Sequence, residues 1–193
     1  MQNRRKTELI ALTGGIGSGK SLALEIIKNS GVFTLSCDAL VTELYKKRAF
    51  LLKLKSLFPG QVSVLKAEVN RKEISKTIFS DAEKRIKLNA LVHPKVIKLA
   101  FKIINKAKQN KAVLEVPLLF ESNLEEHFNK IIVVIRDINE REKSLLERGL
   151  TKEEIVSRIN SQVDYEKKDL SKYVIIQNNG TKTHLKEQLL KVI

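Results

Sequence analysis

The sequence has few of the residues on which disulfide-linked, membrane-spanning or base-stacking proteins depend. It contains a single cysteine, Cys37, no tryptophan and only 5% aromatic residues. One cysteine cannot build an intramolecular disulfide framework, which fits a reducing cytosol. Scarce aromatic rings leave few platforms on which single-stranded nucleic acid could stack. The first apolar run, which ends at Leu12, is about five residues long, too short for a signal-peptide core or a membrane span. We therefore expect a cytoplasmic protein without a membrane partner.

Acidic residues are scarce relative to basic ones. The 193 residues include 36 Lys and Arg against 22 Asp and Glu, which gives a formal net charge of +14. This balance attracts polyanions, of which nucleic acid and polyphosphate small molecules are the first candidates. The basic residues are scattered, with runs no longer than Lys46-Lys47-Arg48. Charge alone therefore does not choose between a solvated basic surface, attraction of a small substrate and nucleic-acid binding.

The most informative segment is the glycine-rich stretch 14–21, Gly-Gly-Ile-Gly-Ser-Gly-Lys-Ser, which has the spacing of a phosphate-binding P-loop. It follows the apolar run 9–12, typical of a buried strand, and precedes helical spacing over 22–27. Backbone N–H groups of such a loop cradle phosphate oxygens, Lys20 places an ammonium near the β- and γ-phosphates, and Ser21 offers its hydroxyl to Mg²⁺. We therefore predict a nucleoside triphosphate site. Its predicted nucleotide-binding residues here are Gly14, Gly15, Ile16, Gly17, Ser18, Gly19, Lys20, Ser21 and Leu22.

Strand and helix signals alternate along the chain. Besides 9–12, strands are expected at 31–35, 111–116, 131–135 and 173–176. Asp38 is expected to open a helix, and a lysine-rich amphipathic stretch over 81–110 predicts a long helix that Pro94 ends or kinks. Strands separated by helices predict an α/β fold of the P-loop NTPase type. We expect a parallel five-stranded sheet with helices on both faces and the nucleotide at the carboxyl ends of the strands.

Further segments narrow the activity. They are Ser36-Cys37-Asp38, Leu91-Val92-His93-Pro94, Val116-Pro117-Leu118-Leu119-Phe120-Glu121, Gln162 and Asn178-Asn179-Gly180. With the P-loop, and in this order from about residue 9 to about residue 190, they make the chain strongly resemble the dephospho-coenzyme A kinase family. The resemblance implies transfer of the ATP γ-phosphoryl group to the ribose 3′-hydroxyl of dephospho-coenzyme A, with Mg²⁺ as cofactor. The products would be coenzyme A and ADP, and we expect no nucleic-acid partner and a monomer or weak homo-oligomer.

The predicted organisation is a single P-loop kinase domain over 1–193, because a chain of this length forms one domain with small insertions. Its core is expected at about 7–45, 111–137 and 171–193. A helical acceptor-binding insertion is expected at about 46–110, and a lid at about 138–170.

Three residues are predicted to be catalytic: Lys20, Asp38 and Arg148. Asp38 follows the second strand, where a carboxylate can accept or orient the proton of the attacking hydroxyl; a helix N-cap is the alternative role. The family usually carries a second Asp two residues earlier, and this chain has Ser36 there. Arg148 would stabilise charge on the transferring phosphoryl group, as a planar guanidinium does well, or else lie solvated on its helix.

The lid departs from the family pattern. That pattern has Gln, then Arg three residues later, then Arg four residues beyond, and the matching positions are Arg141, Ser144 and Arg148. Ser144 carries no charge. Arg141 and Lys143 are the candidates to replace the missing arginine.

The resemblance also implies an acceptor site. Its residues would be Asp38, Arg71, His93, Pro117, Leu118, Leu119 and Glu121, and Asn178 would join the nucleotide site. Plainer roles stay open: His93 as a buried structural residue, 117–120 as core packing, and Glu121 as a helix cap. Glu115 is a weaker candidate for a water-mediated contact to Mg²⁺.

Two other functions compete with this prediction. One is a P-loop kinase for another small acceptor, such as a nucleoside monophosphate or a shikimate-type alcohol. The other is a non-catalytic nucleotide-binding module that acts on nucleic acid. The first leaves His93-Pro94 and residues 117–121 unexplained, and the second predicts basic stripes interleaved with aromatic residues that the sequence does not show.

Overall fold

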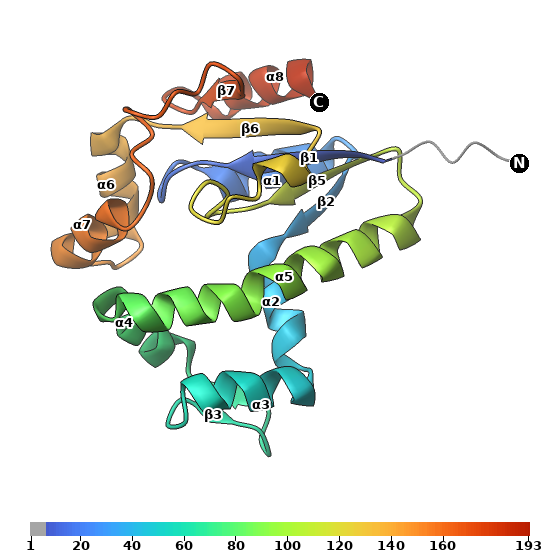
Figure 1. The fold of residues 1–193 in the computed structure, drawn as a ribbon. Coiled ribbons are helices and arrows are strands. Elements are labelled where there is room, and N and C mark those ends of the chain that lie inside the picture. Colours follow the sequence, from blue (N-terminus) through green and yellow to red (C-terminus); the bar gives the residue numbers. More distant parts are fainter. Residues whose placement is uncertain (1–6) are drawn as a thin grey trace, which may run out of the picture. The chain divides into compact units, whose positions relative to one another are not determined.

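The computed structural model describes residues 7–193. Their contacts divide into two compact units: one comprises the described residues up to Ser36 together with Ile104–Ile193, the P-loop unit, and the other is Cys37–Ile103, the helical unit. In chain order the elements are β1 Glu8–Thr13, α1 Lys20–Asn29, β2 Phe33–Ser36, α2 Cys37–Tyr45, α3 Arg48–Leu57, β3 Val62–Ser63, β4 Glu68–Val69, α4 Arg71–Ser80, α5 Ala82–Ala107, β5 Lys111–Glu115, η1 Glu125–His127, β6 Lys130–Ile135, α6 Ile138–Glu147, α7 Lys152–Asn160, β7 Val174–Gln177 and α8 Lys182–Val192 (Figure 1).

The P-loop unit is built on a five-stranded parallel sheet. Its strand order is β2-β5-β1-β6-β7, with every neighbouring pair parallel. Consecutive residues along β1, β5 and β6 are buried, which means that both faces of the central strands are covered. The predicted α/β fold with a parallel five-stranded sheet is therefore confirmed.

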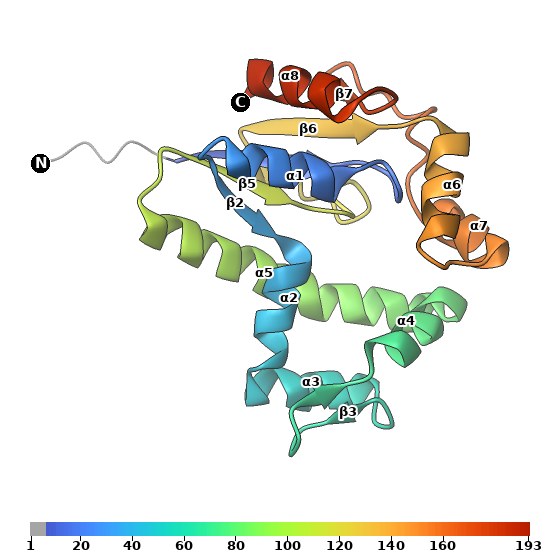
Figure 2. The ribbon, with the colours of Figure 1, turned by 180° about the vertical axis from the view of Figure 1, so that it is seen from behind.

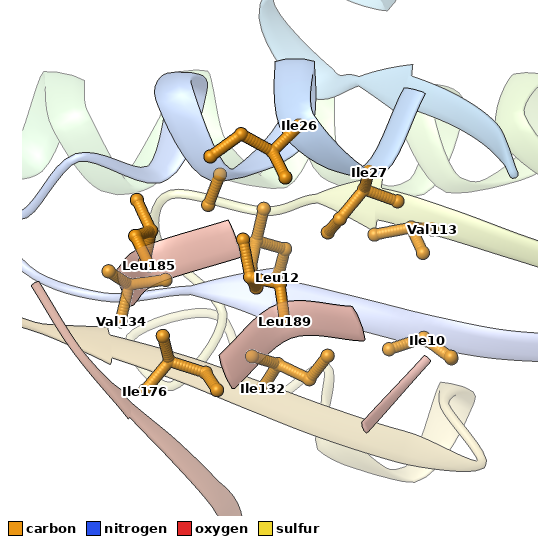
Figure 3. Close-up of a cluster of buried hydrophobic side chains, with 11 residues drawn as sticks. Ile10, Leu12, Ile26, Ile27, Val113, Ile132, Val134, Ile176, Leu185 and Leu189 are labelled. Atoms are coloured by element: carbon orange, nitrogen blue, oxygen red, sulfur yellow. The ribbon is translucent and has the colours of Figure 1, made fainter. Parts of the chain in front are cut away.

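One face of this sheet packs on α1 and α8, which also contact each other (Figure 2). The apolar core between them takes side chains from four strands and both helices (Figure 3). Its members are Ile10, Leu12, Ala23, Ile26, Ile27, Val113, Ile132, Val134, Ile176, Leu185 and Leu189. Each large aliphatic side chain buried there contributes about 1.5–3 kcal/mol. This core fixes the strand ends from which the P-loop and the segment before α6 emerge.

The helical unit contains α2, α3, α4, most of α5 and the two-stranded antiparallel hairpin β3–β4. The sequence prediction did not include this hairpin, because strands of two residues leave almost no alternating pattern. Buried Phe50, Leu51 and Leu54 of α3 recur at helical spacing, and α3 contacts α2 and β3. The unit therefore has an apolar centre of its own.

Helix α5 runs without a break from Ala82 to Ala107 with Pro94 inside it. The expectation that Pro94 ends the helix is wrong. A proline removes one backbone hydrogen bond and crowds the preceding turn, but apolar contacts of the same helix offset that cost. Val92, Val96 and Ala100, on either side of the proline, are all buried.

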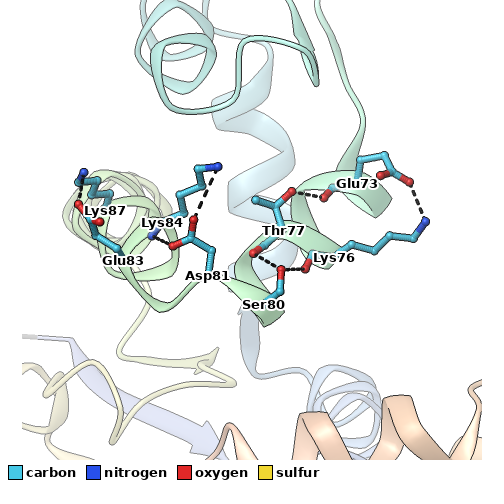
Figure 4. A network of polar contacts seen from close by, with 8 residues as sticks. All are labelled: Glu73, Lys76, Thr77, Ser80, Asp81, Glu83, Lys84 and Lys87. Carbon is cyan, nitrogen blue, oxygen red and sulfur yellow. Dashed lines mark hydrogen bonds and ion pairs between the residues drawn. The ribbon is translucent and has the colours of Figure 1, made fainter.

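Short-range ion pairs cover the surface where α4 meets α5 (Figure 4). Lys76 pairs with Glu73 at 2.9 Å, Lys87 with Glu83 at 2.5 Å, and Lys84 with Asp81 at 3.7 Å. These pairs are largely solvated and screened, so each contributes little to stability. The lysine-rich character of this stretch is thus a feature of its exposed face. Within residues 7–193, no helix is both long and apolar enough to cross a membrane.

Candidate active site

The glycine-rich loop joins β1 to α1, as predicted. Gly14 has φ 144° and Gly19 has φ 95°, backbone conformations that residues with a Cβ rarely adopt. A Cβ on Gly14 would collide with the carbonyl oxygen of Val134, and one on Gly19 would collide with the side-chain amide of Asn178. Glycine is therefore required at both positions by conformation and by space.

Lys20 is the first residue of α1 and is buried. Its Nζ donates to the carbonyl oxygens of Gly14 at 2.8 Å and Gly15 at 2.9 Å. These bonds hold the ammonium against the loop, at a helix N-terminus that already favours anions. The local geometry thus gathers positive charge where the sequence predicted the phosphates.

The segment around α6 and α7 holds the loop from outside. Ile16 donates its N–H to Oε1 of Gln162 at 2.7 Å, and its carbonyl oxygen accepts from Nε of Arg141 at 2.8 Å. The Arg141 guanidinium lies so close to Gly15 that a Cβ there would be 2.7 Å from one of its nitrogens. Burial lowers the pKa of Arg141. Arg141 and Gln162 are therefore positioning residues for the P-loop.

Asn178 is also tied to the loop. It lies one residue beyond β7, is buried, and donates from Nδ2 to the carbonyl oxygen of Ser18 at 2.9 Å. The next residue, Asn179, accepts from the N–H of Asp137 at 2.8 Å, which fixes the start of α6. The turn after β7 thus joins the P-loop to the segment that begins at the end of β6.

A cavity of about 310 Å³ opens beside the P-loop. Its lining is rich in cations and comes entirely from the P-loop unit: Gly17, Gly19, Lys20, Ser21, Leu22, Arg136, Ser144, Arg148, Asn178, Gly180 and Lys182. Arg148 and Ser144 thus share one cavity with Lys20. Lys143 does not line it and is exposed.

A second cavity of about 270 Å³ adjoins the loop at Gly15 and Ser18 and includes Arg136, Arg141 and Tyr165. Several buried polar atoms near the loop have no hydrogen-bond partner among the described residues. They are Ser18 Oγ, Glu121 Oε2 and Arg136 Nε, whereas the buried hydroxyl of Tyr165 interacts with Thr13 and with the backbone of Gly14. Buried polar groups are normally paired, so Ser18 and Arg136, which both line this cavity, have hydrogen-bonding capacity that the chain itself does not use. Burial raises the pKa of Tyr165 to about 12, which keeps its hydroxyl protonated.

Two oxygen-bearing side chains, of Ser21 on α1 and Glu115 at the end of β5, meet beside the P-loop, and Ser36 lies across from Glu115 on β2. Ser21 Oγ donates to Oε1 of Glu115 at 3.3 Å, and Glu115 is buried. Ser36 is the register partner of Glu115 across β2 and β5. A hydroxyl and a carboxylate are hard oxygen ligands of the kind that Mg²⁺ binds together with substrate phosphates. The residues present fit that cation, although no group of three or more His, Cys, Asp or Glu ligands is found in the described part of the chain.

In the helical unit, Asp38 is the second residue of α2 and is exposed. The helix already begins at Cys37, so Asp38 is not its N-cap, and the alternative role as a cap does not apply. Asp38, Thr42 and Tyr45 recur at helical spacing on α2. Arg71 donates from a terminal nitrogen to Thr42 Oγ1 at 3.0 Å, and its guanidinium carbon lies 4.9 Å from the Tyr45 ring centre.

These contacts make an acid–base cluster from residues that lie far apart in sequence. Burial raises the pKa of the Tyr45 hydroxyl, the Arg71 charge opposes that shift, and the Asp38 charge adds to it. Asp38 and Arg71 therefore both lie near enough to Tyr45 for their charges to act on its hydroxyl. The sequence did not single out Thr42 or Tyr45, although their spacing from Asp38 was visible.

The other predicted acceptor residues have varied surroundings. His93 is half-buried on α5, and burial lowers its pKa, so it is neutral at physiological pH. Leu119 is fully buried, as core packing requires, while Pro117 and Leu118 are partly exposed. Glu121 accepts from the Val163 N–H at 2.8 Å, a bond that links the turn after β5 to the chain beyond α7.

Sequence reasoning also missed Arg136 and Tyr165. Arg136 directly follows β6, where the apolar strand gives way to a charged residue, and this abrupt change was a usable signal. Tyr165 lies in a stretch without regular secondary structure, and nothing in its sequence neighbours marks it as buried.

Comparison with known proteins identifies the family. The family model described as dephospho-CoA kinase matches residues 8–184. A dephospho-CoA kinase of Shouchella clausii is 34% identical over 185 residues, 93% of this chain and 94% of that protein. The one from Fusobacterium nucleatum is 32% identical over 174 residues, 89% of this chain and 90% of that protein.

Solved structures agree with the sequence comparison. A crystal structure of a Thermus thermophilus protein superposes with a TM-score of 0.84 at 30% identity, covering 96% of this chain and 95% of that one. Dephospho-CoA kinase from Campylobacter jejuni gives a TM-score of 0.65 at 26% identity, with 97% and 96% covered. A Janibacter sugar kinase at 12% identity and a TM-score of 0.53 shares the fold alone. The chain therefore belongs to the dephospho-CoA kinase family, as its P-loop and the segments that follow it predicted.

Proposed function

We propose that this chain transfers the γ-phosphoryl group of ATP to the ribose 3′-hydroxyl of dephospho-coenzyme A, the last step of coenzyme A synthesis. The observation that carries the proposal is the cation-lined cavity at the P-loop, in a chain whose family acts on this acceptor. Phosphoryl transfer requires charge neutralisation and alignment more than covalent chemistry, and this cavity offers both.

On the nucleotide side, the loop N–H groups and Lys20 bind the phosphates, and Arg148 offsets charge on the transferring group. Lys20 reaches that position because two loop carbonyls already hold its ammonium. Ser21 and Glu115 would hold Mg²⁺, which when bound neutralises phosphate charge. Asn178, Arg141 and Gln162 keep the loop in the conformation that these contacts need.

On the acceptor side, Asp38 accepts the proton of the 3′-hydroxyl. The 3′-oxygen forms a bond to the γ-phosphorus, the bond from that phosphorus to the bridging oxygen of ADP breaks, and ADP leaves. Arg71 is held by Thr42 and Tyr45 and binds the acceptor's diphosphate. The remaining acceptor residues are His93, which is a neutral imidazole, and the turn 117–121, which ends at Glu121.

We further propose that the protein acts in the cytoplasm on freely diffusing small molecules, as a monomer or weak homo-oligomer. Its single cysteine and the scattered basic residues support this proposal.

A coupled assay of ADP release tests the proposed function. Dephospho-coenzyme A should exceed adenosine, AMP and shikimate by orders of magnitude in kcat/KM. An equal or higher value for any of those three would assign the chain to another acceptor.

A further inference from the structure

The lid carries a serine at the position where the family pattern has an arginine, and the structure shows what surrounds it. Ser144 lies on α6 and lines the same cavity as Lys20 and Arg148. Its hydroxyl brings no charge to that cavity. If two guanidinium groups are to bind the phosphates, a residue other than Ser144 must therefore supply the second one.

Arg136 lines this cavity from the end of β6. Its side chain is 24% exposed, and one terminal nitrogen donates to Oε2 of Glu140 at 3.2 Å. Its Nε is buried and has no hydrogen-bond partner within residues 7–193. A guanidinium that lines a cation-rich cavity and is oriented there by one carboxylate is suited to bind an anion.

Arg141 is the other arginine near the loop, and it has a different task. Its Nε is already used on the Ile16 carbonyl oxygen, and its guanidinium packs on Gly15. It does not line the cavity that contains Lys20 and Arg148. Arg141 therefore restrains the loop backbone, whereas Arg136 faces the cavity.

We propose that Arg136 is the second guanidinium contact to the triphosphate and fulfils the role that Ser144 cannot. The inference rests on the proposed function insofar as the ligand is ATP. It adds a nucleotide-binding residue that the family pattern does not place, and it explains how the chain tolerates serine in its lid. In this proposal the positive charge comes from Arg136 at the end of β6 and not from position 144 on α6.

The test compares Arg136→Ala and Arg136→Gln with the double variant Arg136→Ala/Ser144→Arg, and uses Lys143→Ala as the matched lid control. Losing a charged hydrogen bond should lower kcat/KM for ATP by about tenfold or more in both single Arg136 variants. The KM for dephospho-coenzyme A should stay unchanged. The double variant should recover most of the loss, because an arginine at 144 enters the same cavity.

A binding measurement separates this inference from the proposed function. The dissociation constant of a fluorescent ATP analogue should rise about tenfold in Arg136→Ala and Arg136→Gln, whatever the acceptor. If wild type binds the analogue but phosphorylates no dephospho-coenzyme A, the proposed function fails while this readout still tests Arg136. Three results would overturn the inference. The first is unchanged affinity and kcat/KM in both Arg136 variants. The others are a double variant no better than Arg136→Ala and a loss confined to Lys143→Ala.

Discussion

The P-loop unit and the helical unit are built for different kinds of binding. In the P-loop unit, the loop is held by Asn178, Arg141 and Gln162, and Lys20 is buried against its carbonyl oxygens. In the helical unit, Asp38 and Arg71 are exposed and are linked through Thr42 and Tyr45 on α2. The proposed nucleotide side is thus held by hydrogen bonds within the P-loop unit. The proposed acceptor side has its charged groups on the exposed surfaces of two helices, Asp38 on α2 and Arg71 on α4.

This contrast between the two units matches the chemistry proposed for each. Phosphate binding depends on backbone N–H groups, whose direction is fixed only if the whole loop is fixed. The proposed acceptor recognition depends instead on side chains of α2 and α4, where Asp38 and Arg71 are exposed. We therefore expect variants in the two units to separate binding of nucleotide from binding of acceptor.

The largest effect is expected from Lys20→Met, which keeps an unbranched chain and removes the charge. Turnover should fall by about a thousandfold, because the ammonium next to the transferring phosphoryl group is lost. The loss of two bonds to loop carbonyls should lower the melting temperature only slightly. A steady-state assay and a thermal melt measure both quantities. Near-native turnover would refute the phosphate role of the loop.

Asp38→Asn is the matching change in the helical unit. It keeps the shape and removes the charge and the proton-accepting capacity, so kcat should fall at least about a hundredfold. The melting temperature should not change, because the side chain is exposed and does not cap α2. Affinity for the fluorescent ATP analogue should also stay unchanged. Full activity of Asp38→Asn would show that another carboxylate is the general base, and Glu115 and Glu121 would be tested next.

A smaller effect is expected where Ser21 meets Glu115. Glu115→Gln should raise the Mg²⁺ concentration needed for half-maximal activity by about tenfold. Ser36→Asp should lower that concentration, because it adds a carboxylate at the register position beside Glu115. A titration of activity with Mg²⁺ measures both variants. Identical titrations for wild type and Glu115→Gln would exclude Glu115 from the metal site.

The smallest effect concerns His93. Its folded-state pKa lies below the ordinary 6.5 because the ring is buried. Below about pH 6.5 the unfolded chain therefore binds more protons than the folded one, and stability falls as the pH drops. Melting curves at about pH 7.5 and about pH 5.5 should show a smaller drop for His93→Gln than for wild type. Equal drops would mean that the burial of His93 contributes nothing measurable.

The sequence predicted much of the P-loop unit because its signals are local. The loop spacing, the β-branched run 131–135 and the strands around it are each readable within a few residues. Continuity of α5 through Pro94 was not predictable, because it depends on where Val92, Val96 and Ala100 are buried. The roles of Arg136, Tyr45 and Tyr165 depend on contacts between distant segments, which local patterns do not encode. Arg141 was one of two candidates to replace the missing lid arginine, and three features separate it from Arg136: it bonds the Ile16 carbonyl oxygen, packs on Gly15 and does not line the cavity that contains Lys20.

The position of the phosphate on the product tests the proposed function most directly. Purified protein with ATP, Mg²⁺ and dephospho-coenzyme A is followed by phosphorus NMR, alongside a measurement of ADP. Transfer to the 3′-hydroxyl predicts one new phosphate monoester, on the ribose 3′-oxygen, in an amount equal to the ADP formed. A monoester at the 2′-oxygen, or ADP formed without any new monoester, would contradict it.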